Sequence, residues 1–351
     1  ATFTLRADGS SNFGPANRWG YFPSAALAWK VKNEAFLKDV EWLDNLKLRF
    51  GWGLVGNQAA GSYAYGVTMS SAPSIWGTGF YAGNYPNENL QWEETEAWNV
   101  GLDINLFNNR VEFIVDAYYK NTDNLLMQAS LPSYVNGVIT SPWVNAGAMT
   151  NKGMEFTLNT VNIDTKDFMW RSGLTISFNR NEITDLYTAT SSMSGKFDSE
   201  TYTYSIVGEP VGQFYGYKVK GMFMNESDFY QKDADGNFLL NERGGRIHVA
   251  LPADHSEISK EEIWVGDYIF EDINNDGVID EKDRTFLGNP EPKFSYGFNN
   301  TFTYKGFDLN IFINGVYGNK LVNMLRQDFT DPMRNSNLLK EATGIARVEL
   351  I

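Results

Sequence analysis

The clearest chemical pattern in this sequence runs from residue 272 to residue 283. Oxygen-bearing side chains occupy positions 1, 3, 5 and 12 of a twelve-residue loop, namely Asp272, Asn274, Asp276 and Asp283. The sixth position is a glycine, and Val278 would supply its backbone carbonyl at the seventh. Ca²⁺ prefers such oxygen ligands, and glycine permits the sharp turn between them. The pattern predicts an EF-hand-like calcium loop that orders a long connection rather than catalyses a reaction.

Two departures from the EF-hand pattern accompany this loop. Its last position is Asp283 instead of the bidentate glutamate, and the preceding residues 264–270 are predicted to be extended instead of helical. Both features make the loop more similar to the calcium loops of dockerins. A turn rich in Asx residues that needs no metal stays open as the alternative.

The sequence offers little for catalysis. It contains two histidines, His248 and His255, and both fall in a polar loop, whereas a Ser-His-Asp site would need one of them. Phosphate-binding glycine loops, HExxH motifs and nucleophile elbows are missing. Carboxylates such as Glu112 and Asp116 are expected on a solvated strand face. We therefore do not expect an enzyme.

Aromatic side chains recur in the long loops, among Asn, Asp and Glu residues. Sugar rings offer C–H groups that stack on aromatic faces and hydroxyls that bind polar neighbours. Packing of these rings within the loops, or against a partner protein, is the other possibility. The candidate ligand-binding residues are Trp76, Tyr81, Tyr85, Trp92, Tyr134 and Trp143.

The elements that must position these loops show period-two alternation. One face of the segment 98–106 carries Trp98, Val100, Leu102, Ile104 and Leu106. After only four residues the alternation starts again at residue 111 and continues to residue 119. Such alternation over about ten residues predicts strands with one apolar and one polar face. Nine strands can be placed in this way, over residues 2–7, 19–31, 46–54, 98–106, 111–119, 154–158, 170–178, 294–304 and 307–313.

A transmembrane β-barrel and a soluble β-sandwich both have such faces, and three features favour the barrel. The strands reach about ten residues, which exceeds the usual five or six of globular sheets. Short and long connections alternate, unlike those of a Greek key. Trp and Tyr lie near strand ends, as interfacial anchors do. We predict an all-β, antiparallel transmembrane β-barrel portion of about nine strands with long extracellular loops, of which residues 187–292 form the longest.

Composition limits the classes of partner. The formal net charge of -14 argues against nucleic acid, which requires clustered Lys and Arg. The absence of cysteine excludes disulfides, thiol catalysis and thiolate metal sites. Mean hydropathy is -0.36 and the sequence has no run of 18 apolar residues, which excludes a helical membrane protein.

An ordered series of motifs resembles the SusC/RagA-type TonB-dependent transporters of Gram-negative outer membranes. The motifs cover nearly the whole chain in order and spacing, and fall within residues 6–14, 18–24, 46–49, 56–58, 145–147, 151–155, 266–277, 288–290 and 304–309. The resemblance identifies residues 1–351 as the C-terminal part of such a barrel. It implies a twenty-two-stranded outer-membrane barrel with an N-terminal plug.

The resemblance also implies partners and cargo. TonB, with ExbB and ExbD, would energise import through an N-terminal part that this sequence lacks, and a SusD-like surface lipoprotein would cap the barrel. The cargo would be an oligosaccharide or a peptide, and a siderophore or cobalamin is the second cargo class. The sequence starts within a strand pattern without a signal peptide, so we expect a piece of a larger protein. The alternative class is a soluble or surface-bound, calcium-stabilised glycan-binding protein or adhesin.

Overall fold

The computed structural model describes residues 1–129, 139, 141–186, 193–197, 200–254, 257–259, 262–331 and 337–341. The chain divides into two compact units. Unit 1 comprises Ala1–Met193, Ser205–Val211 and Glu291–Asn319, and unit 2 comprises Ser194–Tyr204, Gly212–Pro290 and Lys320–Ile351.

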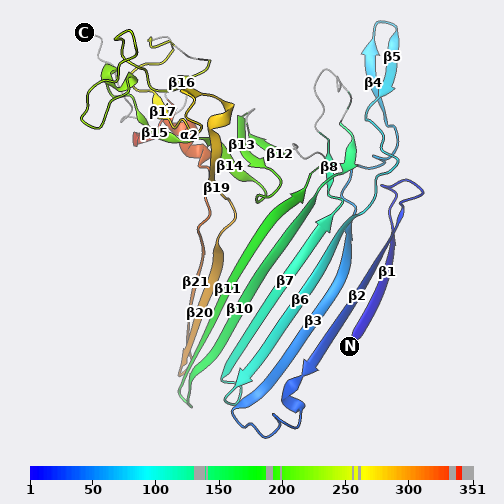
Figure 1. Cartoon of the computed structure of the whole chain (residues 1–351). Coiled ribbons are helices and arrows are strands. Elements are labelled where there is room, and N and C mark those ends of the chain that lie inside the picture. Colours follow the sequence, from blue (N-terminus) through cyan, green and yellow to red (C-terminus); the bar gives the residue numbers. More distant parts are fainter. Residues whose placement is uncertain are drawn as a thin grey trace. The chain divides into compact units, whose positions relative to one another are not determined.

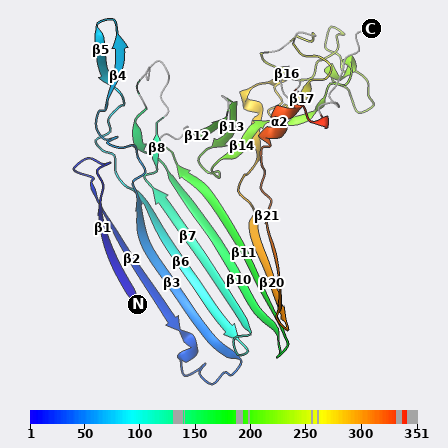
Figure 2. The same ribbon diagram turned by 180° about the vertical axis from the view of Figure 1, so that it is seen from behind.

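Unit 1 is built on a nine-stranded sheet in which neighbours in sequence are also neighbours in space (Figure 1). Every pairing in this sheet is antiparallel. The view from behind shows the same uninterrupted order (Figure 2). Its strands are β1 (Thr2–Gly9), β2 (Trp19–Lys30), β3 (Leu43–Asn57), β6 (Glu93–Leu106), β7 (Val111–Asp123), β10 (Ala148–Asp164), β11 (Phe168–Asp185), β20 (Phe294–Tyr304) and β21 (Phe307–Tyr317). All nine strands predicted from alternation are present.

Tight turns join the strands at one end of the sheet. Phe107, Asn108 and Asn109 connect β6 to β7 with φ of 57°, 59° and 59°, and the Lys305–Gly306 turn connects β20 to β21 with φ of 44° and 88°. Left-handed backbone of this kind matches the right-handed twist of a hairpin, and Asn and Gly adopt it at low cost. The long connections leave from the opposite end (Figure 1).

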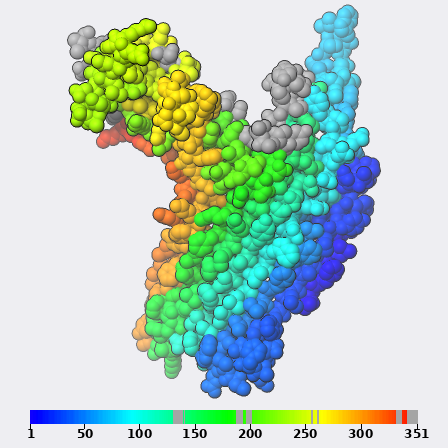
Figure 3. All heavy atoms as spheres, in the orientation of Figure 1, coloured from blue at the N-terminus to red at the C-terminus, as the bar shows by residue number. Residues whose placement is uncertain are grey.

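One face of the sheet is apolar and uncovered. Leu48, Val100 and Ile311 are 40 %, 53 % and 44 % exposed, so no second sheet of the described residues lies against them. In the space-filling view the sheet forms adjoining bands of colour from blue through cyan and green to orange (Figure 3). A soluble protein rarely exposes so large an apolar surface. The described structure therefore does not have the two packed sheets of a β-sandwich.

Shorter elements lie in the long connections of unit 1. A separate hairpin consists of β4 (Met69–Ser74) and β5 (Gly77–Ala82), and β8 (Leu126–Gln128) pairs with β9 (Trp143–Asn145). A 3-10 turn, η1 (Val31–Asn33), follows β2. Among the described residues no helix is long and apolar enough to cross a membrane.

Unit 2 is formed by small sheets and turns. A four-stranded sheet has the order β12 (Met193–Phe197), β13 (Glu200–Ser205), β14 (Gln213–Tyr217) and β19 (Arg284–Gly288). The pair β15 (Val219–Met222) and β17 (Tyr268–Phe270) is antiparallel, and the pair β16 (Leu251–Pro252) and β18 (Val278–Ile279) is parallel. The helical elements are η2 (Glu226–Phe229), η3 (Glu281–Asp283) and α2 (Met324–Thr330). Phe223, Phe229 and Ile263 form a small hydrophobic core.

Candidate functional site

The polar face of the nine-stranded sheet carries a cluster of charges centred on Arg49 of β3. Its Nη2 lies 2.7 Å from Asp103 Oδ1 on β6, and its Nη1 lies 2.9 Å from Asp116 Oδ1 on β7. Lys47 Nζ lies 3.4 Å from the other oxygen of Asp103. The guanidinium passes over Gly101, where any side chain would collide with it. The four charges balance, and Arg49 joins three strands through charge-assisted hydrogen bonds.

A second group on the polar face explains one motif of the sequence. The ring of Tyr118 on β7 lies over Gly153 of β10, where a Cβ atom would overlap the tyrosine hydroxyl. The hydroxyl donates to Asn179 Oδ1 at 2.8 Å. Asn179 and Asn181 both donate to the carboxylate of Glu291, the latter at 2.6 Å. Gly153 is therefore required by the close approach of Tyr118.

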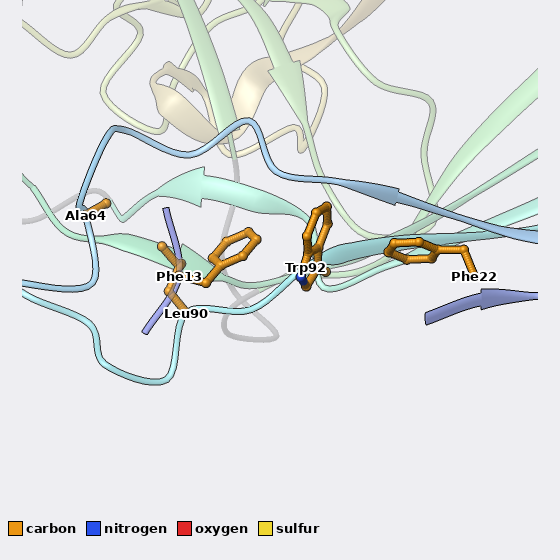
Figure 4. Packing of buried hydrophobic residues seen from close by; sticks show 5 residues of the cluster. All are labelled: Phe13, Phe22, Ala64, Leu90 and Trp92. Carbon is orange, nitrogen blue, oxygen red and sulfur yellow. The ribbon is translucent and has the colours of Figure 1, made fainter. Parts of the chain in front are cut away.

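A hydrophobic cluster closes the base of the long loops. Phe13, Phe22, Ala64, Leu90 and Trp92 are all buried (Figure 4). The rings of Phe13 and Phe22 lie 5.2 Å and 5.4 Å from Trp92, tilted and edge-on respectively. Phe22 also fills the space beside Gly20 and Gly56, both of which belong to the sequence motifs quoted above. These glycines allow the ring to reach the cluster.

The predicted aromatic ligand-binding residues that the structure describes fall into three groups by exposure of their side chains: buried, half-buried and exposed. Trp92 is 7 % exposed and its Nε1 donates to the Arg18 carbonyl at 3.4 Å, so this ring packs within the loops, which is the other possibility that the sequence left open. Trp143 is half-buried and packs against the same cluster. Tyr81 and Tyr85 are half-buried, and Tyr134 lies outside the described residues.

Trp76 is the member of the set that is open to solvent. It lies between β4 and β5 and is 90 % exposed, as is the adjacent Ile75, while Phe80 is 70 % exposed. The sequence around this hairpin contains no charged side chain from residue 50 to residue 87. An isolated two-stranded hairpin is marginally stable in water. Its exposed, uncharged apolar surface is suited to a contact with another molecule.

The predicted calcium loop folds as a series of turns closed by its own side chains. Asp272 accepts from the backbone N–H of Asp276 at 3.2 Å and of Gly277 at 2.9 Å. Asn274 Oδ1 accepts from Asp276 N at 2.9 Å, and Asp276 Oδ1 accepts from Val278 N at 3.0 Å. These side-chain-to-backbone hydrogen bonds form a series of Asx turns.

Asp283 faces the interior of this loop. It is 0 % exposed, and its carboxylate accepts from Ile273 N at 2.8 Å and from Asp280 N at 2.9 Å. These backbone N–H groups, and that of Asp280 most strongly, hold the pKa of Asp283 below its ordinary value. Lys282 Nζ lies 3.3 Å from Asp280 and 3.9 Å from Asp276. Across the described residues, no three His, Cys, Asp or Glu side chains form a group ready to hold a metal.

His248 packs against the ring of Tyr230 with a centroid separation of 4.9 Å, and His255 lies outside the described residues.

Sequence patterns did not indicate the contacts of Phe22 with Gly56 and of Tyr118 with Gly153, because each joins residues of different strands. A signal exists in hindsight: Gly153 and Gly56 lie in otherwise regular strands, where glycine marks a close approach.

Comparison with known families gives a match along most of the sequence. A family model described as TonB dependent receptor-like, beta-barrel, matches residues 1–253. TonB-dependent receptor P3 of Formosa agariphila is 34 % identical over 330 residues, which are 92 % of this chain and 30 % of that protein. TonB-dependent receptor SusC of Bacteroides thetaiotaomicron is 35 % identical over 332 residues, which are 91 % of this chain and 29 % of that protein. The chain thus spans about three tenths of the length of these relatives.

Solved structures share the fold. The RagAB peptide importer in its closed-closed state matches with a TM-score of 0.73 and 23 % identity, over 93 % of this chain and 32 % of that one. The match confirms the predicted portion of an antiparallel transmembrane β-barrel. The proteins matched are receptors and transporters rather than enzymes, which agrees with the expectation from the sequence.

Proposed function

The chain belongs to the TonB-dependent receptor β-barrel family, in its SusC/RagA type, and from this membership we propose that it forms part of an outer-membrane nutrient importer. One observation carries the proposal. A single sheet has an uncovered apolar face, which suits lipid, and an opposite face of balanced charges, which suits a water-filled interior. In this arrangement the tight turns face the periplasm and the long connections face outward.

Energy for import would reach the barrel through parts of the protein outside this chain. Since the relatives are about three times longer, the plug and the contact with TonB, ExbB and ExbD are assigned to the remaining length. The test is uptake in a Gram-negative host that carries or lacks the gene. Uptake should require both the gene and the proton gradient. Uptake that continues in the presence of a protonophore would contradict TonB-dependent import.

For the cargo we propose an oligosaccharide, with a peptide as second candidate. Exposed Trp76 and half-buried Tyr81 and Tyr85 lie in an uncharged connection that suits neutral sugar rings. The peptide alternative is supported by the fold shared with a peptide importer. Competition of labelled neutral oligosaccharides and labelled peptides for uptake distinguishes the two. Uptake of peptides alone would overturn the sugar assignment and leave import intact.

We assign the β4–β5 hairpin to contact with a SusD-like surface lipoprotein. Ile75, Trp76 and Phe80 provide exposed apolar surface without charge, and aromatic anchors dominate protein interfaces. Changing all three to serine should reduce co-purification of the lipoprotein with the full-length receptor. Tyr63→Ser, at another exposed aromatic of the same connection, is the matched control. Equal recovery from both variants would remove the hairpin from this interface.

The loop 272–283 remains a proposed structural Ca²⁺ site. Asp272, Asn274, Asp276 and Asp283 would hold the ion with the Val278 carbonyl once their oxygens draw together, since within the described residues no three carboxylates form such a group. Each carboxylate oxygen has a second lone pair for a cation beside its N–H donor. Bound Ca²⁺ would supply charge neutralisation and displace Lys282 from Asp276.

A further inference from the structure

Two positively charged side chains lie opposite each other on the apolar face of the nine-stranded sheet. Lys152 of β10 is paired with Arg180 of β11, and both side chains are exposed. Lys152 shares its face with Met154, and Arg180 shares it with Phe178, because residues two apart on a strand point to the same side. Like charges directly opposite each other destabilise a sheet. The pair therefore gains stability when an anion binds both charges.

This pair of cations lies where the apolar band ends. Phe168 and Phe178 are ten residues apart on one face of β11, which at a tilt near 45° covers about 24 Å of an apolar band of about 25 Å. Met154 and Phe178 form the last apolar pair of β10 and β11 toward the long connections. Lys152 and Arg180 come next, so they stand at the level of the lipid head groups.

No carboxylate of the described residues neutralises the two cations. Neither Lys152 nor Arg180 forms an ion pair within the described part of the chain. Glu182 is two residues farther out on the same face of β11, where it is paired with Thr150 and forms no ion pair with either cation. A net positive charge therefore remains at the edge of the apolar band.

The guanidinium of Arg180 is already oriented by the backbone beside it. Its Nη1 donates to the carbonyls of Pro292 at 3.4 Å and Lys293 at 3.1 Å. Its Nε and Nη2 form no hydrogen bond with the described residues. A guanidinium with free donors binds a phosphate through two parallel hydrogen bonds, and a lysine adds a point charge. Tyr119, which is paired with Lys152 and is 46 % exposed, adds a ring of the type that favours membrane interfaces.

The position of these two strands leaves this face turned toward the membrane in a larger barrel. β10 and β11 are the sixth and seventh of nine strands (Figure 1). Further strands would be added at the sheet edges β1 and β21, and an N-terminal plug would lie against the polar face. Neither addition covers the apolar face at Lys152 and Arg180.

We propose that Lys152 and Arg180 form a site on the barrel exterior that binds the phosphate group of a glycolipid of the outer leaflet. The outer leaflet of a Gram-negative outer membrane consists of phosphorylated glycolipid, and basic groups beside an apolar surface bind lipid head groups. The acyl chains would lie along the apolar face below the pair. The inference rests on the proposed outer-membrane placement, with the long connections facing outward.

The test uses the full-length receptor, freed of lipid in detergent, and its melting temperature as a readout of binding. The ligands are the purified phosphorylated glycolipid, the same lipid after removal of its phosphate, and inorganic phosphate. The phosphorylated lipid alone should raise the melting temperature of the parent. An equal rise with the dephosphorylated lipid would show that the acyl chains suffice, and an equal rise with inorganic phosphate would show a site for a free anion. Either result would overturn the proposal.

Lys152→Gln is the decisive variant, because the described fold gives this side chain no partner that its loss would disturb. It should weaken binding of the phosphorylated lipid about tenfold, since one charge-assisted contact is lost. Lys152→Arg should bind like the parent. Lys166→Gln, at an exposed lysine of the tight turn at the opposite end of β11, is the matched control and should stay within about twofold of the parent. Parent-like affinity of Lys152→Gln would overturn the site.

The lipid-free receptor separates binding from folding. Lys152→Gln should melt no lower than the parent, because it removes one of two like charges. A lower melting temperature without lipid would show that Lys152 stabilises the fold itself, and would overturn the proposal, as would a second protein bound at the pair in the receptor isolated from membranes. Absence of the receptor from the outer-membrane fraction would overturn import and this site together. A receptor that imports cargo but binds lipid independently of phosphate would overturn this site alone.

Discussion

The apolar face of unit 1 is best tested by an arginine placed at Leu174 of β11. Leu174 is paired with Leu158 on one side and Phe298 on the other, all on the apolar face. Phe178 and Phe168 bracket it on the same strand and face. Two residues advance a strand by about 6.8 Å, which is about 5 Å along the membrane normal at a tilt near 45°. Leu174 then lies about 10 Å below Phe178 and about 14 Å above Phe168, near the middle of an apolar band of about 25 Å.

Arginine near the bilayer midplane costs about 2–4 kcal/mol on the lipid face of a barrel. Thr175→Arg is the matched control, because Thr175 is adjacent, exposed and on the polar face, with one long hydrogen bond of 3.4 Å to the Gly297 carbonyl. Its cost should stay below about 1 kcal/mol. Asp103 is unsuitable as a control, since it is an ion-pair partner of Arg49 and Lys47.

The assay is the folding equilibrium of the full-length receptor in phospholipid vesicles, titrated with denaturant. Leu174→Arg should lower the free energy of unfolding by at least 2 kcal/mol relative to the parent, on the scale given above. Equal free energies for Leu174→Arg and Thr175→Arg would refute the assignment of lipid to this face.

Three other predictions concern the loop base and unit 2. Gly56→Ala should cost about 1–3 kcal/mol of unfolding free energy, because its methyl group falls on the Phe22 ring; an unchanged denaturation midpoint would show that the ring can move aside. Backbone N–H donors, chiefly that of Asp280, keep the pKa of Asp283 low in the folded state. The stabilisation that the ionised carboxylate gives to the fold is therefore complete above the unfolded pKa of about 3.9, and it is lost as pH falls through the lower folded value. Protease resistance of residues 200–290 should therefore fall in acid, and Asp283→Asn should remove that pH dependence. If Asp283→Asn and the parent lose resistance over the same pH range, the titrating group is not Asp283. EDTA should also reduce this protease resistance, and added Ca²⁺ should restore it. The Ca²⁺ effect should be lost in Asp276→Ala and kept in Lys282→Ala. Protease resistance of the parent that changes with neither reagent would exclude a structural metal.

The nine wall strands could be predicted because alternation is a local signal. Leu48, Val100 and Ile311 each lie in a strand of 11 to 15 residues whose apolar side chains recur with period two, and the barrel environment repeats at every strand. The β4–β5 hairpin escaped this reasoning. Its strands of six residues contain Ser, Ala, Gly and Pro and lack alternation.

Burial in the loops could not be predicted, since composition does not distinguish a packed ring from an exposed one. Trp92 and Trp76 lie in the same connection, yet Phe13 and Phe22 cover the first and the described structure leaves the second open. Phe13 and Phe22 lie 79 and 70 positions before Trp92 in the sequence. Likewise the spacing of residues 272–283 predicted a loop of oxygen-bearing side chains, whereas the backbone donors that bind Asp283 depend on the three-dimensional closure of the loop.

The neutrality of residues 50–87 has a practical consequence for isolating any complex formed there. Attraction between exposed charges fades as ionic strength rises, with a Debye length of about 3 Å in 1 M salt, whereas apolar contacts are not screened. A partner held by Ile75, Trp76 and Phe80 should therefore stay attached through high-salt washes and come off in mild chaotropes. Purification in concentrated salt would then strip adventitious, charge-bound proteins and keep the genuine companion.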